Sequence, residues 1–256
     1  MKLFKHLKAL TWSSTIVASA LLSACGSGDS ESWNIGYKEI TVFGENPAVC
    51  TSLSSDVNWD ALLEANCHNL SDYNLFTDPT ESTTEPNAPG IPYDMNTQLF
   101  TDYASKYRFI FVPPNSAATY TEHEVMDFPV GSVLVKTFTV PKSTSDRSGT
   151  EHVIETRLLI HRANGWEAVP YYWSSEDNAQ YVNYGVSIPV STTHKGEKLS
   201  FNYGVPTKND CTNCHAISPI RQDENDLRVS IFKPIGPKAR YLNWEIDYGN
   251  DEVENQ

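Results

Sequence analysis

Basic residues are scarce in this chain of 256 residues. Lys and Arg together number 19, Asp and Glu number 32, and the formal net charge is −13. An acidic surface repels the phosphates of nucleic acids and the headgroups of anionic lipids. We therefore exclude nucleic acid as a partner and expect a basic redox protein to suit this charge better.

Hydrolase motifs and long apolar runs are also missing. The sequence contains no G-x-S-x-G elbow, no phosphate-binding loop and no H-E-x-x-H. An apolar stretch at residues 16–22 is too short to cross a bilayer comfortably. It fits a secretion signal better than a membrane-spanning helix.

The start of the chain has the three parts of a bacterial lipoprotein signal. Lys2, Lys5 and Lys8 precede the apolar stretch, and Leu22-Ser23-Ala24-Cys25 closes it with small residues before a cysteine. This pattern predicts that residues 1–24 are removed and that Cys25 receives lipid. An ordinary signal peptide or a short transmembrane anchor is the alternative.

Residues 25–32 are rich in Gly, Ser and acids, and we interpret them as a tether between lipid and domain. Gly26 and Ser27 follow the cysteine, with no Asp at the second position. By bacterial sorting rules this favours lipid anchoring at the periplasmic face of the outer membrane. The remaining length suffices for one large domain or two modest ones.

The middle of the chain predicts strands. Asn164-Gly165 separates two of them, as expected of a tight hairpin turn. We also expect a short strand at 40–43, a helix from Ser55 or Asp56 to about Ala65, and loops at 77–90 and 143–149. The expected fold is mainly β: an antiparallel β-sandwich-like domain at 33–205, followed by a short haem-c-type segment at 206–256. The main expected strands are 108–112, 132–140, 153–162, 166–173, 181–190 and 199–203.

The chemical signal is Cys211-Thr212-Asn213-Cys214-His215. In C-x-x-C-H the two thiols bind haem vinyl groups as thioethers, and the histidine becomes the proximal iron ligand. We therefore predict one haem c, held covalently by Cys211 and Cys214 and ligated by His215. Three alternatives are a thioredoxin-like redox pair, a zinc site, and a plain disulfide. Exported location favours haem, because attachment occurs outside the cytoplasm.

Cys50 and Cys67 are left over once Cys25 and the motif cysteines are assigned. In an oxidising compartment they most simply form a disulfide. The competing interpretation makes Cys67-His68 a metal or haem ligand pair.

A sixth iron ligand is not evident, because residues 216–256 contain neither Met nor His. An upstream residue, a five-coordinate iron, or an unusual ligand such as Lys233 or Tyr241 are the options. A methionine ligand would raise the haem potential, whereas an open position would let the iron bind small molecules. The upstream candidates are Met95, Met126, His68, His123, His152, His161 and His194.

Several other side chains invite interpretation. A platform for a sugar ring could be formed by Trp166 together with Tyr171-Tyr172-Trp173, although such residues more often fill a core. Glu155-Thr156-Arg157 is interpreted as part of a solvated sheet face. Lys136 shares a face with Leu134 and Phe138, which suggests a lysine at a sheet edge.

Further segments carry a family resemblance: Ile91-Pro92-Tyr93-Asp94-Met95-Asn96-Thr97, Leu99 to Arg108, Asp127 to Gly131, and Pro234 to Arg240, together with the C-x-x-C-H. In this order they resemble exported bacterial dihaem c-type cytochromes, a family that includes conserved hypothetical proteins. Family members continue into a second C-x-x-C-H, and this chain ends before one. We interpret it as a truncated or short form with one haem.

The expected function is periplasmic one-electron transfer by a lipid-anchored c-type cytochrome-like protein. The alternative is a haem-free, β-rich surface lipoprotein that binds carbohydrate or a protein partner. An enzyme with an open haem position is a third hypothesis, and we expect an electron-transfer protein rather than a catalyst.

Overall fold

The computed structural model describes residues 33–217, 231–248 and 253–256. The expected signal peptide, the lipid site Cys25 and the tether lie outside the described residues. No helix in the described part of the chain is long and apolar enough to cross a membrane.

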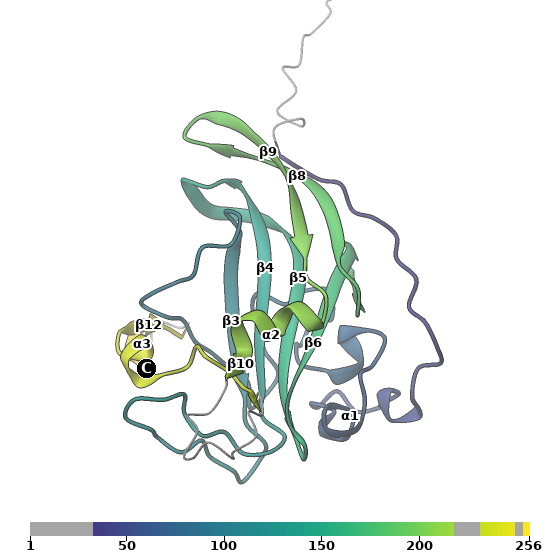
Figure 1. Cartoon of the computed structure of the whole chain (residues 1–256), viewed down its shortest axis with the longest axis vertical. Coiled ribbons are helices and arrows are strands. Elements are labelled where there is room, and N and C mark those ends of the chain that lie inside the picture. Colours follow the sequence, from purple (N-terminus) through teal and green to yellow (C-terminus); the bar gives the residue numbers. More distant parts are fainter. Residues whose placement is uncertain (1–32, 218–230, 249–252) are drawn as a thin grey trace, which may run out of the picture.

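The described residues form a mainly β protein, as the sequence predicted, built around one nine-stranded curled sheet (Figure 1). Its centre is the antiparallel series β3–β4–β5–β6, followed by the short strand β7. The β8–β9 hairpin joins through a parallel pairing of Ser143 with Thr193, and β1 and β2 pair with β8 and β3. The bounds are β1 Asn34–Ile35, β2 Ile91–Pro92, β3 Ser105–Phe111, β4 Val133–Ser143, β5 Asp146–Arg162, β6 Gly165–Ser175, β7 Asn178–Tyr181, β8 Val186–His194 and β9 Glu197–Val205.

Two hairpin turns set the register of the central strands. The β5–β6 turn pairs Arg162 with Gly165, whose φ of +108° only glycine adopts easily, so the expected hairpin is confirmed. The β4–β5 turn pairs Ser143 with Asp146. The loop expected at 143–149 is therefore wrong: it is a tight turn, because both strands continue past the apolar residues into exposed polar sequence.

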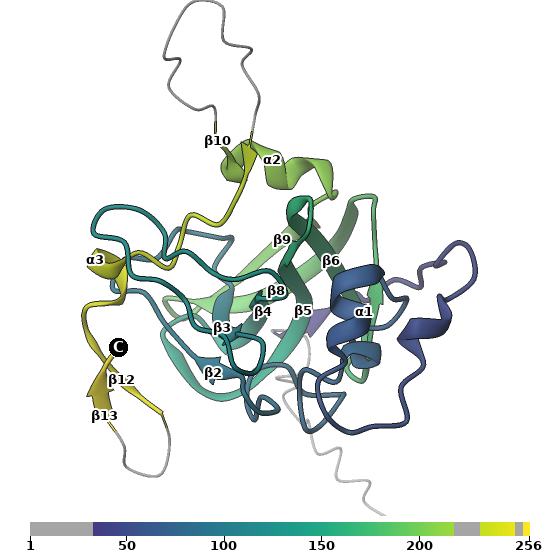
Figure 2. The same cartoon turned by 90° about the horizontal axis from the view of Figure 1, so that it is seen from below.

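One face of the sheet packs against the segment that precedes β2. This segment contains the short helix α1 (Trp59–Glu64) and the 3-10 helices η2 (Ala48–Cys50) and η3 (Leu70–Tyr73). Figure 2 shows α1 beside β5. The shared core includes Leu62 and Tyr73 from this segment and Val135, Leu158 and Trp173 from the strands. Alternate residues of each strand therefore face this helical layer.

The opposite face is covered by two different layers. Curling of the sheet brings Ile188 and Tyr203 of β8 and β9 against Phe138, Ile154 and Tyr172 of β4, β5 and β6. This gives the sandwich-like layering that the sequence suggested. The rest of this face meets the long connections between strands and the C-terminal segment.

The C-terminal segment begins in front of the central strands, at α2, and ends at α3 and β12 beside β3 (Figure 1). Leu242 joins a core cluster with Tyr93, Ile110, Phe128 and Leu134. Backbone bonds such as Met126 N to Pro237 O (3.1 Å) and Asn96 N to Tyr241 O (2.9 Å) fasten it. Its elements are η4 Asn209–Cys211, α2 Thr212–His215, β10 Ala216–Ile217, β11 Ile231–Phe232, α3 Ala239–Leu242, β12 Glu245–Asp247 and β13 Val253–Asn255.

Two local predictions are wrong. The helix begins at Trp59 rather than near Ser55, because the Asn58 side chain accepts the Ala61 N–H (3.2 Å) and caps it. Residues 40–43 form no strand. Pairing with β8 ends at Ile35 in β1, next to Pro189, which has no N–H to continue the ladder. The expected loop at 77–90 is confirmed as irregular.

Candidate functional site

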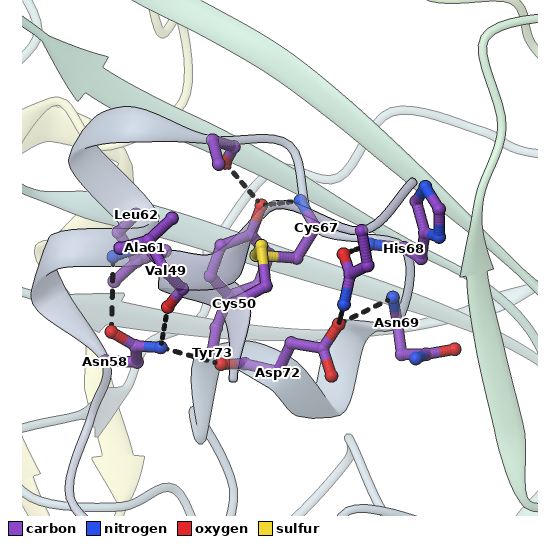
Figure 3. Close-up of a disulfide and its surroundings, with 12 residues drawn as sticks. Val49, Cys50, Asn58, Ala61, Leu62, Cys67, His68, Asn69, Asp72 and Tyr73 are labelled. Atoms are coloured by element: carbon purple, nitrogen blue, oxygen red, sulfur yellow. Dashed lines mark hydrogen bonds between the residues drawn. A yellow bond between two sulfur atoms is a disulfide. The ribbon is translucent and has the colours of Figure 1, made fainter. Parts of the chain in front are cut away.

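Cys50 and Cys67 form the expected disulfide, with Cα atoms 5.6 Å apart and both residues buried (Figure 3). The Tyr73 hydroxyl accepts the Cys67 N–H (2.9 Å) and donates to the Ala65 carbonyl (2.9 Å). The Cys67 sulfur is therefore committed to the disulfide. The alternative in which Cys67 and His68 act as a ligand pair is overturned.

The C-x-x-C-H motif spans two consecutive helical turns, η4 and α2, in front of the central strands (Figure 1). Thr207 starts them: its N–H bonds the Asp210 carboxylate (2.9 Å), and its hydroxyl accepts the Asp210 N–H (3.1 Å). This reciprocal pair caps the turn as a capping box does. Cys211 and Cys214 are free thiols, three residues apart on one helical face.

His215 is held with one ring nitrogen committed. Its Nδ1 lies 2.9 Å from the carbonyl oxygen of Lys233, which follows β11. A carbonyl only accepts, so Nδ1 carries the proton and Nε2 keeps a lone pair. Burial lowers the pKa of the imidazole, and the bond to Lys233 acts in the opposite direction. Pairing of β10 with β11 brings the two residues together.

Cys211, Cys214 and His215 all line one cavity of about 550 Å³. This lies within the range of roughly 300–1,000 Å³ that holds small molecules and cofactors. Its walls are largely apolar and come from three sources. The strands supply Arg108, Leu134, Val135, Lys136, Arg157, Leu159, Ala168, Val169 and Pro170; the segment before β3 supplies Tyr93, Met95, Thr97, Gln98 and Leu99; the C-terminal segment supplies Pro206, Asp210, the motif residues, 234–238 and Tyr241.

The candidate sixth ligands differ in whether they line the cavity. Among the described residues, Met95 is the one upstream Met or His that lines it, and a Cβ on Gly236 would lie 3.1 Å from Met95 Sδ. Tyr241 lines the cavity as well, whereas Lys233 does not. The other upstream candidates lie elsewhere in the fold: Met126, His68, His123, His152, His161 and His194. His161, for example, stacks on Trp166 with ring centroids 4.7 Å apart.

Lys136 does not guard a sheet edge. Its strand β4 is paired on both sides, with β3 and β5, and the side chain lines the cavity. Burial lowers the pKa of the Lys136 ammonium to about 7, and the charges of Arg108 and Arg157 act in the same direction. Alternation places Lys136 on the same face as Leu134, as the sequence predicted, but this face is covered.

The other two side-chain interpretations are also corrected. Tyr171, Tyr172 and Trp173 are fully buried in β6, so they cannot stack on a sugar. Both faces of this strand are covered, by the helical layer and by β8 and β9. Glu155 is fully buried rather than solvated, and it accepts bonds from Arg157 (2.9 and 2.5 Å) and the Tyr203 hydroxyl (2.6 Å).

The sequence did not predict that Arg108 and Arg157 line the cavity. A charged residue within an apolar strand, as in Arg108-Phe109-Ile110-Phe111, was a usable signal, because buried charges need partners or a ligand. Their meeting point depends on strand register, which the sequence does not display.

The donor set fits a covalent haem. Free thiols at the required spacing, an imidazole with an available Nε2, and apolar walls meet in one cavity. In the described residues there is no group of three or more His, Cys, Asp or Glu side chains that could hold a metal ion directly. Comparison of the chain with family models, curated proteins and solved structures finds no match.

Proposed function

We propose that this protein is a lipid-anchored c-type cytochrome that transfers single electrons in the periplasm. One observation carries the proposal: Cys211, Cys214 and His215 line the same cavity, and the Lys233 carbonyl orients the His215 imidazole with Nε2 available. A histidine ligand whose other nitrogen donates to a backbone carbonyl is the usual arrangement at metal sites.

Each motif residue has a defined role in this proposal. Cys211 and Cys214 would hold haem through thioether bonds to its vinyl groups, and His215 would ligate its iron. When bound, haem supplies an iron that cycles between two oxidation states. The chain would keep water from the site with apolar side chains such as Leu134 and Leu159. Burial in this cavity and the choice of ligands would then set the potential.

Met95 is the best-placed candidate for the sixth ligand. Among the upstream Met and His residues of the described chain, Met95 alone lines the cavity. Its sulfur lies against Gly236 of the C-terminal segment. A thioether is a soft ligand that stabilises reduced iron and raises the potential. A six-coordinate iron of this kind suits electron transfer better than binding of small molecules.

The anchoring and the partner follow from the sequence. Lipid on Cys25 would hold the domain at the periplasmic face of the outer membrane, and the acidic surface would favour a basic redox partner. The resemblance to dihaem cytochromes is part of the same proposal, with one haem expected in this chain.

The test is an intact mass and visible spectrum of the full chain, produced in a periplasm with cytochrome c maturation. We expect the mass of one haem, retained after denaturation, and a sharp α band on reduction. Cys211→Ala/Cys214→Ala should lose both signals, whereas the matched control Cys50→Ala/Cys67→Ala should keep them. A colourless wild-type protein with Cys211 and Cys214 disulfide-bonded would overturn the proposal and leave the haem-free surface lipoprotein.

A further inference from the structure

Three cationic side chains form a row across the sheet inside the cavity. Arg108 of β3 is the register partner of Lys136 of β4, and Lys136 is the partner of Arg157 of β5. All three line the cavity. Like charges that face each other on neighbouring strands repel, and the repulsion grows as water is excluded. Such a row is unexpected in an acidic chain unless an anion compensates it.

The chain compensates this row only in part. Arg157 forms an ion pair with Glu155, and Arg108 forms one with Asp94, with Nη1 2.5 Å from Oδ1. Lys136 makes no ion pair or hydrogen bond within the described residues; its ammonium lies over the Phe138 ring, 4.8 Å from the centroid. When Lys136 is protonated, three cations of the described chain therefore face two carboxylates.

Arg108 also has unused donors. Its side chain is only 2% exposed, and its Nε and Nη2 have no hydrogen-bond partner among the described residues. Buried guanidinium donors without partners are rare, because they lose water and gain nothing in return. Asp210 is the acidic residue in the described lining of the cavity, and its carboxylate accepts a hydrogen bond from the Thr207 hydroxyl. The other lining cation, Lys238, is paired with Glu124.

We propose that Arg108 and Lys136 form a receptor for a carboxylate inside this cavity. A planar carboxylate matches the free donors on one side of the guanidinium, and the Lys136 ammonium adds a charge-assisted bond. If the proposed function holds, on which this assignment of the source rests, the carboxylate is a propionate of the haem. Otherwise it is a free small carboxylate held by the same pair.

The first arm of the test uses the haem-loaded full chain. Arg108→Gln and Lys136→Met are compared with Lys106→Gln, which removes a cation from the same strand as Arg108 but outside this cavity. Resonance Raman spectroscopy of the propionate bending bands is the readout. We expect these bands to shift in the first two variants and to stay unchanged in the third. Circular dichroism and urea unfolding check that each variant is folded.

The second arm uses the full chain with Cys211→Ser/Cys214→Ser, made without haem, and titrates it calorimetrically with acetate and succinate. Saturable binding that Arg108→Gln weakens by about ten- to a hundredfold, as expected for lost charge-assisted bonds, supports the receptor with a free carboxylate. If haem attaches but the Raman bands and the titration are both unaffected, the receptor is refuted and the cytochrome stands. If no haem attaches yet succinate binds in this manner, the cytochrome is refuted and the receptor stands.

Discussion

Removal of the Cys50–Cys67 disulfide should destabilise the protein by an amount that the chain separation predicts. The bond closes a loop with a sequence separation of 17 residues. Loop-closure entropy then gives about 3 kcal/mol of stabilisation, since the unfolded chain is more restricted when the bond is present. For a protein of this size, Cys50→Ala/Cys67→Ala should lower the melting temperature by about 6–12 °C.

The measurement is equilibrium urea unfolding of the wild type and the double variant, each with and without reductant. Reductant should cost the wild type the same amount and leave the variant unchanged, because the variant has no bond at this place to lose. The haem content should be equal in both proteins, since the two cysteine pairs lie at different sites. A loss below about 1 kcal/mol would refute the reasoning, because it would mean that this segment is ordered without the bond.

Two further predictions concern the cavity and the charge buried near it. Met95→Ala should abolish the weak far-red absorption band of methionine-ligated ferric haem, while Met126→Ala, which lies outside the cavity, should preserve it; a retained band in Met95→Ala would exclude Met95 as the ligand. Glu155→Gln should cost about 3–5 kcal/mol in urea unfolding, because Arg157 would lose its buried partner. The control Glu176→Gln removes an exposed carboxylate beside His152 and should cost less than about 1 kcal/mol. Similar losses in the two glutamine variants would contradict the role assigned to burial.

Local patterns were enough to predict the β architecture. The alternation of apolar residues and the Asn164-Gly165 turn act between near neighbours, so the β5–β6 hairpin followed from them directly. The pairing of Cys50 with Cys67 followed from counting the cysteines. The predicted helix boundary was wrong because Asn58 supplies the cap, two or three residues after the expected Asp56 or Ser55. The strand predicted at residues 40–43 is absent, because a strand needs a partner whose backbone N–H groups are free to pair with it.

The candidate site was likewise only partly predictable from the sequence. The C-x-x-C-H spacing is a property of consecutive residues, so the sequence alone indicated Cys211, Cys214 and His215. It left seven upstream candidates for a sixth ligand, because nothing local distinguishes one methionine or histidine from another. The fold brings Met95 to the cavity and leaves the other six elsewhere.

The sequence by itself determined that the chain is mainly β, that it contains a C-x-x-C-H motif, and which two cysteines are bonded. These depend on periodicity, on spacing and on composition. Only the tertiary structure decided that Arg108, Lys136 and Arg157 form one row and that Glu155 is buried. Register between strands and curling of the sheet set these positions, and both arise from contacts between residues far apart in the chain.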